Sequence, residues 1–171
     1  MISIRTASQD DAIFISLLGR ITFNETFGDL FKDNGDLPNY LNRTFSVSKI
    51  KKSLNNENNQ FYLAFVDDLP VGYAKLKLNS ASEFIDSKKI SQLQKIYVLK
   101  DFLSMKIGHQ LQSLLLDRAK VLGSKSIWLS VYKENERAIA FYKKNQFAEV
   151  GSHNFSIGSH DFIFSVMEKK F

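Results

Sequence analysis

The sequence predicts an α/β (α+β) fold: a mixed, mostly antiparallel sheet of six to seven strands with helices on both faces. Three observations favour it. A hairpin of two apolar strands lies in the first half of the chain, one long amphipathic helix lies between two apolar strands in the second half, and two further strands close the sequence. The 171 residues suit a single domain, residues 1–171, with enough core to fold alone.

The first sixty residues predict a strand followed by helices. Alternation over Ile2–Thr6 indicates an opening strand, and residues 10–26 carry apolar side chains near helical spacing. A polar segment that ends at Pro38 breaks this helix. Two short helices are then predicted, Pro38–Phe45 and Val47–Leu54, the second capped by a serine.

A β-hairpin is predicted next, from Phe61–Val66 and Leu69–Leu78 with two aspartates as its turn. Gly72 within the second strand indicates a bulge or the close approach of another backbone. The polar segment 79–89 is expected to form a loop.

The clearest helix follows a strand predicted at Leu93–Leu99. Its apolar residues recur at helical spacing and a glycine ends it: Ile107, Leu111, Leu114, Leu115, Ala119, Leu122 and Gly123. The remaining elements are a buried strand, a short helix and two closing strands around a Gly158 turn: Ile127–Val131, residues 135–144, Phe147–Phe155 and Asp161–Met167.

The composition is that of a globular protein, with 44% hydrophobic and 24% charged residues. No apolar run approaches the ~20 residues of a membrane span, and the N-terminus lacks the features of a signal peptide. The absence of cysteine excludes thiolate metal sites and a cysteine nucleophile. We therefore expect a cytoplasmic protein without a membrane partner. The net charge of +5 comes from lysines scattered among acidic residues, so no nucleic-acid partner is expected.

The connection between the strand at residues 93–99 and the long helix predicts an anion site. Its residues are Met105, Lys106, Ile107, Gly108 and His109. Amides at the start of a helix point outward, the helix dipole favours negative charge, and a glycine lets the backbone approach a phosphate. Lys106 adds a positive charge, and His109 adds a side chain able to bond a phosphate. An ordinary strand–helix connection is the alternative.

Residues 135–147 carry the motif that suggests a function. The stretch from Asn135 to Phe147 closely resembles the motif N-x-x-A-x-x-F-Y-x-x-x-G-F of the GNAT superfamily of N-acetyltransferases. The resemblance implies that Tyr142 protonates the departing thiolate and that Asn135 and Ala138 lie near CoA. A phenol with a pKa near ~10 is a suitable acid for that step. Tyr142 as a core aromatic residue is the alternative.

Nearly the whole chain is similar to the PaiA-type bacterial spermine/spermidine N-acetyltransferases, for example at residues 22–27 and 133–136. The resemblance implies the GNAT fold with a splayed acyl-CoA cleft and, without a metal, acetyl transfer from acetyl-CoA to a primary amine such as spermidine or spermine. The pantetheine arm would pair with the backbone of Ile96, Tyr97 and Val98, and the pyrophosphate would rest on the amides of the loop described above. A peptide N-terminus as acceptor and a non-catalytic acyl-CoA-binding or sensing domain are the alternatives.

Three features depart from the family pattern. Lys106 stands where the family loop has its first glycine, and Gln146 stands where the motif has a glycine. Gln92 and Gln94 occupy the strand on which many family members carry a glutamate as general base. Glutamine does not accept a proton at neutral pH. A water chain, a carboxylate elsewhere such as Glu25, or an amine that is already neutral would have to serve.

Acidic residues after the first helix predict the acceptor side. They are Glu25, Asp29, Asp33 and Asp36. We expect Glu25 and Asp29 to bind the amine substrate, with an ordinary solvated loop as the alternative. No metal is expected, because His153 and His160 lack a third ligand at suitable spacing. The chain is expected to be a monomer or a homodimer.

Overall fold

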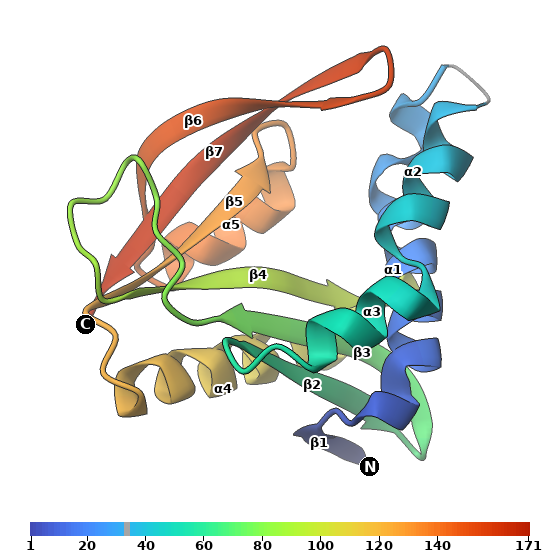
Figure 1. Ribbon diagram of the computed structural model, residues 1–171, viewed down its shortest axis with the longest axis horizontal. Coiled ribbons are helices and arrows are strands. Elements are labelled where there is room, and N and C mark those ends of the chain that lie inside the picture. The colour runs from blue at the N-terminus through green and yellow to red at the C-terminus, as the bar shows by residue number, and fades with distance from the viewer. Residues whose placement is uncertain (33–34) are drawn as a thin grey trace.

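The computed structural model describes residues 1–32 and 35–171 of the chain. Within them, seven strands form one sheet in the order β1-β2-β3-β4-β5-β7-β6 (Figure 1). The strands are β1 (Ile2–Thr6), β2 (Asn59–Val66), β3 (Leu69–Lys77), β4 (Ile90–Val98), β5 (Ser126–Tyr132), β6 (Ala148–Ile157) and β7 (His160–Lys170). The helices are α1 (Ala12–Phe27), α2 (Asp36–Thr44), α3 (Val47–Leu54), α4 (Ile107–Val121) and α5 (Glu136–Lys144), with short 3₁₀ helices η1 (Gln9–Asp11), η2 (Gly28–Leu30) and η3 (Lys100–Met105). The predicted mixed, mostly antiparallel sheet is confirmed.

Helices cover both faces of the sheet because the strands alternate their side chains between two apolar cores. On β2, Tyr62 and Ala64 belong to a core that includes α4, whereas Phe61 and Leu63 belong to a core that includes α1 and α3. The predicted stripe on α4 supplies four residues of the first core: Ile107, Leu111, Leu115 and Ala119. A third, mainly aromatic core joins α1, the end of α2 and the β6–β7 hairpin: Phe23, Phe27, Phe45, Ile157 and Phe162.

Strands β4 and β5 are neighbours only where they begin. Their parallel ladder joins Ile90–Gln92 to Ser126–Trp128 among the described residues, and the two strands then fan apart (Figure 1). The edge of β4 that faces β5 is consequently without a strand partner over Leu93–Val98. Unpaired backbone groups on such an edge are available to another extended chain.

Two bulges shape the centre of the sheet. The register between β2 and β3 shifts at Val71, beside Gly72, and a Cβ added at Gly72 would lie 2.7 Å from the carbonyl oxygen of Tyr97. The expected bulge and close backbone approach at Gly72 are therefore both present. A second bulge leaves Gln94 of β4 without a partner on β3, and bulges of this kind bend a strand and re-aim its side chains.

Most predicted elements agree with the structure to within a few residues. The two turn aspartates, Asp67 and Asp68, both have positive φ, as a tight two-residue hairpin requires. Residues 100–105, expected to be loop, form the 3₁₀ helix η3. Strands β6 and β7 run longer than predicted because β7 lies inside the sheet, paired with β5 and β6. No described helix is long and apolar enough to cross a membrane.

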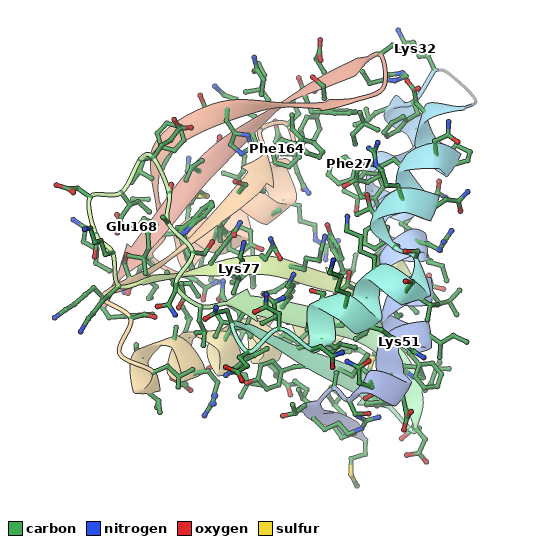
Figure 2. The ribbon with its side chains drawn as sticks, viewed as in Figure 1. Phe27, Lys32, Lys51, Lys77, Phe164 and Glu168 are labelled. Atoms are coloured by element: carbon green, nitrogen blue, oxygen red, sulfur yellow. The ribbon has the colours of Figure 1, made fainter. Side chains whose placement is uncertain are left out.

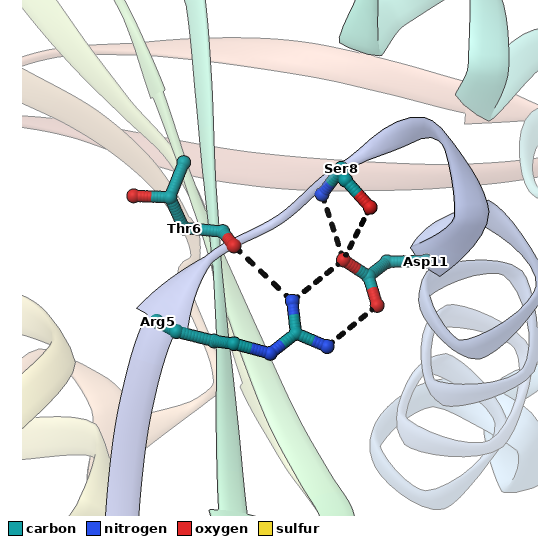
Figure 3. Close-up of polar contacts among 4 residues, drawn as sticks. All are labelled: Arg5, Thr6, Ser8 and Asp11. Carbon is teal, nitrogen blue, oxygen red and sulfur yellow. Dashed lines mark hydrogen bonds and ion pairs between the residues drawn. The ribbon is translucent and has the colours of Figure 1, made fainter.

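An ion pair fixes the start of α1 against β1 (Figure 3). The guanidinium of Arg5 donates to both carboxylate oxygens of Asp11 at 2.7 and 2.8 Å, and the Ser8 amide donates to the same carboxylate at 2.7 Å. These donors, with Arg5 first, hold the pKa of Asp11 down at about 2. The contact positions α1, which packs against β3 and β4.

Candidate active site

The N-terminus of α4 presents a set of free amides. The amide of Gln110 makes the first intrahelical bond, to the carbonyl of Lys106 at 3.2 Å, so the amides of Ile107, Gly108 and His109 precede the helical ladder. A Cβ built on Gly108 would meet only a methyl of Ile96, at 4.0 Å. The helix start is therefore uncrowded where Gly108 would carry a side chain, which suits the approach of a pyrophosphate.

The loop before α4 keeps a left-handed conformation without a glycine. Lys106, the cap residue of α4, has φ +58° and ψ +21°, a conformation that glycine adopts at little cost. Gln146, after α5, has φ +68°. The two positions where glycine of the family motif is replaced therefore hold a backbone shape that favours glycine, at a cost of about 1 kcal/mol each.

The free edge of β4 leads directly to this loop. Ile96 and Val98 pack their side chains into the α4 core, while Tyr97 packs on the opposite face of the sheet. Residues of an antiparallel strand turn their backbone groups alternately to the two edges, and the carbonyl of Tyr97 faces Gly72 of β3. The backbone groups of Ile96 and Val98 therefore point to the edge that faces β5. An extended arm that carries amides would continue the sheet there, with its anionic end at the start of α4.

Helix α5 places the phenol of Tyr142 beside the α4 core. The side chain is partly buried, and its ring centroid lies 5.2 Å from that of Phe141 and 5.6 Å from that of Phe147. Burial raises the pKa of Tyr142 well above 10, and the hydroxyl of Tyr97 on β4 raises it further. The phenol is therefore protonated at neutral pH, and the same rise makes it a weaker acid toward a thiolate than a phenol of ordinary pKa.

Asn135 serves the structure of α5. Its side-chain oxygen accepts a hydrogen bond from the amide of Ala138 at 3.2 Å and so caps the helix. The cap fixes the direction in which α5 leaves β5, and with it the position of Tyr142. A role of Asn135 and Ala138 in holding CoA stays a prediction.

The acidic residues lie around the connection between α1 and α2: Glu25 in the last turn of α1, Asp29 in η2 and Asp36 at the first position of α2. A carboxylate oxygen of Glu25 accepts the backbone N–H of Lys100 at 3.0 Å, and Asp29 is exposed. Asp33 lies outside the described residues. Substrate binding by Glu25 and Asp29 stays a prediction, although the contact made by Glu25 already gives this carboxylate a structural role.

Asp36 at the start of α2 holds the β6–β7 turn. It accepts hydrogen bonds from the amide and hydroxyl of Ser159 at 2.9 and 3.0 Å and contacts Nδ1 of His160 at 2.9 Å. These donors, with the Ser159 amide first, lower the pKa of Asp36. Gly158 is required beside it, because its φ is +58° and an added Cβ would overlap the carboxylate.

The histidines occupy separate places. His109 lies in the first turn of α4, next to the free amides. Nε2 of His153 lies 3.0 Å from the hydroxyl of Ser130, whereas Nε2 of His160 accepts the amide of Lys32 at 3.0 Å. Among the described residues, no group of three histidines or carboxylates is placed to hold a metal ion.

The other side of β4 contains functional candidates that the sequence did not reveal. Figure 2 shows Phe27 of α1 and Phe164 of β7 pointing toward one another, and their ring centroids are 6.5 Å apart. Lys75 and Lys95 lie opposite each other on β3 and β4, both partly buried. The available signal was weak: each is a lysine inside an otherwise largely apolar strand.

Comparisons with known proteins agree with this geometry. A family model described as "Acetyltransferase (GNAT) family" matches residues 23–147. An uncharacterized N-acetyltransferase from the pepI 3' region of Lactobacillus delbrueckii subsp. lactis is 28% identical over 158 residues, which cover 91% of this chain and 88% of that protein.

Solved structures share the whole architecture. The PaiA N-acetyltransferase of Thermoplasma acidophilum, solved in complex with coenzyme A, superposes with a TM-score of 0.76 at 25% identity over 100% of this chain and 99% of that one. A GCN5-related N-acetyltransferase from Rhodopseudomonas palustris reaches 0.78 at 16% identity, over 99% of this chain and 95% of that one, which supports the fold alone. The family match covers most of the chain, and the open start of α4, the free edge of β4 and the phenol of Tyr142 suit the co-substrate that such enzymes use. The chain therefore belongs to the acetyltransferase (GNAT) family, whose enzymes depend on acetyl-CoA.

Proposed function

We propose that this protein transfers the acetyl group of acetyl-CoA to a primary amine, by direct attack of the amine on the thioester. The observation that carries the proposal is the free edge of β4 over Leu93–Val98, which runs into the open N-terminus of α4. This arrangement offers one continuous path for a thioester arm with a pyrophosphate at its end. The PaiA neighbour, whose structure contains coenzyme A, has the same overall fold.

Each part of the co-substrate has a proposed place. The pantetheine amides pair with the outward backbone groups of Ile96 and Val98, on either side of Tyr97, whose carbonyl faces β3. The pyrophosphate rests on the amides from Met105 to His109, and the charge of Lys106 adds to the attraction. The open space at Gly108 accommodates a phosphate without moving any neighbouring side chain.

The chemical step uses this chain's own groups in a simple way. The amine nitrogen bonds to the carbonyl carbon, the carbon–sulfur bond breaks, and the sulfur takes a proton from the hydroxyl of Tyr142. Because its pKa is raised, Tyr142 holds this proton at neutral pH, and the same shift makes transfer to the sulfur less favourable than from a phenol of ordinary pKa. The proton released by the amine leaves through water, and the Tyr142 phenolate takes a proton back from water before the next turnover.

No glutamate stands on β4 to act as general base. The side-chain oxygen of Gln92 accepts the hydroxyl of Ser80 at 3.0 Å, and Gln94 occupies the bulge. Glu25 is engaged with the Lys100 amide. An amine that arrives already neutral therefore suits this site best.

The resemblance to PaiA-type enzymes makes spermidine and spermine the first acceptors to assay, with a peptide N-terminus as a second class. The replacement of the first glycine of the family loop by Lys106 would favour a non-catalytic CoA-binding domain, but Lys106 keeps the left-handed backbone conformation that glycine favours. We place the activity in the cytoplasm. Whether the protein acts as a monomer or a homodimer can be measured by sedimentation.

The direct experiment is a thiol-release assay with acetyl-CoA and a panel of polyamines, amino acids and peptides, together with calorimetric titration of CoA. We expect CoA to bind and at least one amine to release thiol faster than hydrolysis. Binding of CoA without amine-dependent release of thiol would favour the non-catalytic CoA-binding domain. No binding of CoA would contradict both the enzyme and the CoA-binding domain.

A further inference from the structure

Two lysines stand side by side on the face of the sheet opposite α4. Lys75 of β3 and Lys95 of β4 are direct partners in the antiparallel register, so their side chains leave the same face. Both side chains are partly buried. Two ammonium groups in one such pair repel each other unless something negative lies between them.

Aromatic rings, not carboxylates, surround these ammonium groups. Nζ of Lys95 lies 5.1 Å from the ring centre of Phe45 and 5.3 Å from that of Tyr97, and Nζ of Lys75 lies 5.2 Å from that of Phe61. The structure records no ion pair for either lysine among the described residues. The rings offset part of the cost of burial and leave the net charge of the pair unbalanced.

The charged groups that act on the pair are nearly all basic. Lys75 is influenced by three other lysines: Lys95, Lys77 and Lys49. Lys95 is influenced by the hydroxyl of Tyr40 on α2. Burial is the main reason that the pKa of Lys75 falls to about 8 and that the pKa of Lys95 falls as well, and an anion beside them would reverse both shifts.

Lys75 and Lys95 form one cluster with the phenols of Tyr40, Tyr73 and Tyr97. This cluster contains a buried hydroxyl. Tyr73 of β3 is completely buried, and among the described residues its hydroxyl finds no hydrogen-bond partner. Its ring packs edge-on against Tyr97 at 5.6 Å, and its hydroxyl interacts electrostatically with those of Tyr97 and Tyr40. The polar side chains of the cluster are therefore ammonium and phenol groups, all of them able to donate hydrogen bonds.

The cluster lies on the acceptor side of the proposed thioester. Lys95 belongs to the stretch Leu93–Val98 whose free edge would hold the pantetheine arm. Ile96 and Val98 face α4, where the phosphates would bind, whereas Lys95 faces Phe45 at the end of α2. An amine that approaches the thioester from the side of α1 and α2 therefore passes these lysines.

We infer that the acceptor of this enzyme is an amine that also carries an anionic group, a carboxylate or a phosphate, which Lys75 and Lys95 bind while the amine faces the thioester. The inference rests on the proposed acetyl transfer and narrows its substrate class. A polyamine would bring further positive charge to two uncompensated ammonium groups, which repel it.

Matched acceptors test the inference. Alanine is compared with alaninamide, and phosphoethanolamine with ethanolamine, so that each pair differs in the anionic group; spermidine is the cationic member. We expect kcat/KM to be at least about tenfold higher for the anionic member of one pair, and which pair responds separates carboxylate from phosphate. Equal use of both members, or faster use of spermidine, would overturn the inference.

Charge-removing variants locate the effect. Lys95→Met and Lys75→Met keep the length of the side chain, and each is expected to lower kcat/KM for the anionic acceptor by about 10-fold or more and for its neutral partner by less than about 3-fold. Lys95→Arg should retain the preference. Lys120→Met is the control, since this exposed lysine of α4 lies 5.3 Å over Phe171 on the other side of the molecule. An unchanged preference in both methionine variants would contradict the assignment.

A binding experiment separates this inference from the proposed function. N-acetylalanine and acetyl phosphate are titrated calorimetrically into the protein saturated with CoA, where no turnover is needed. Binding that is lost in Lys95→Met and kept in Lys120→Met supports the anion site even if no amine releases thiol. No binding of either probe to the wild-type protein would overturn the site even if some amine is acetylated.

Discussion

The two sides of β4 are built from different kinds of group. On the side of α4, the proposed CoA contacts are backbone amides at Ile107, Gly108 and His109 and the free strand edge. On the side of α1 and α2, the lining consists of side chains: the aromatic core and the lysine pair Lys75 and Lys95. A backbone site tolerates changes of sequence that preserve its shape, whereas a site made of side chains changes its chemistry with each substitution.

Lys106 and Gln146 illustrate the first half of this contrast. Both replace a glycine of the family motif and both hold the left-handed conformation that favours glycine. The backbone geometry of the co-substrate side therefore survives the loss of its motif residues. The acceptor side has no comparable protection, so it is where this chain is expected to differ most from its relatives.

The largest expected effect tests the side chain that is proposed to protonate the departing thiolate. Tyr142→Phe should lower kcat by roughly 10–10³-fold, because the thiolate then leaves without a proton donor. CoA affinity should stay within about 2-fold. Tyr62→Phe is the matched control, since Tyr62 packs in the same core but its hydroxyl bonds to Gln60 at 3.0 Å. An unaltered turnover in Tyr142→Phe would exclude this residue as the acid.

The second prediction concerns the ion pair between Arg5 and Asp11 at the start of α1. Asp11→Asn should lower the free energy of unfolding by about 2 kcal/mol at pH 7, because the Arg5 contact depresses the pKa of Asp11. A depressed pKa stabilises the fold above the unfolded value near ~4, and this contribution disappears as pH falls toward about 2. Urea denaturation at several pH values measures it, with the exposed Asp10→Asn as control. A difference between Asp11→Asn and wild type that does not shrink in acid would contradict the ion-pair account.

The third prediction is a pH dependence of the acceptor side. The affinity of an N-acetylated product that carries an anionic group should fall about tenfold between pH 7 and pH 9, because the free protein loses the charge of Lys75 as pH rises through about 8. Other groups near the pair are Lys95, Lys77, Lys49 and the phenols of Tyr40, Tyr73 and Tyr97. Calorimetry provides the measurement. The dependence should be much weaker in Lys75→Met, and a flat profile in wild type would count against the pair.

The smallest effect concerns the backbone side. Lys106→Gly should raise the free energy of unfolding by about 0.5–1 kcal/mol, because the left-handed strain is relieved, and should change CoA affinity by less than about 3-fold. Lys120→Gly, within α4, should instead destabilise the protein by about 1 kcal/mol. Thermal and urea unfolding test both. A loss of CoA affinity much larger than about 3-fold in Lys106→Gly would show that the charge of Lys106, and not the backbone amides, supplies most of the binding.

The sequence was sufficient to predict the fold and the two elements of the proposed co-substrate side, the start of α4 and the helix α5. Two predictions needed only the local sequence pattern. One was the helix start with a glycine after an apolar strand, and the other was the motif that ends at Phe147. These local signals placed Gly108 and Tyr142 in the regions where the structure has the open helix start and α5.

The side chains of the proposed acceptor side are set by the register between β3 and β4, which the local sequence pattern does not determine. Regular alternation would place Leu93 and Lys95 on one face of β4. The bulge at Gln94 instead leaves Leu93 in the α4 core with Ile96 and turns Lys95 to the opposite face, beside Lys75. The acidic residues were more visible in the sequence, but the carboxylates of Glu25 and Asp36 bond to the chain itself.

The most direct test of the account is the affinity of Gly108→Val for CoA, measured by calorimetry. A Cβ added at Gly108 lies 4.0 Å from the nearest methyl of Ile96, so we expect a valine to fit there with a change of melting temperature below about 3 °C. The side chain would occupy the space assigned to the pyrophosphate, and the Kd for CoA should rise at least about tenfold. Unchanged CoA affinity in a folded variant would contradict the claim that the phosphates rest on the start of α4.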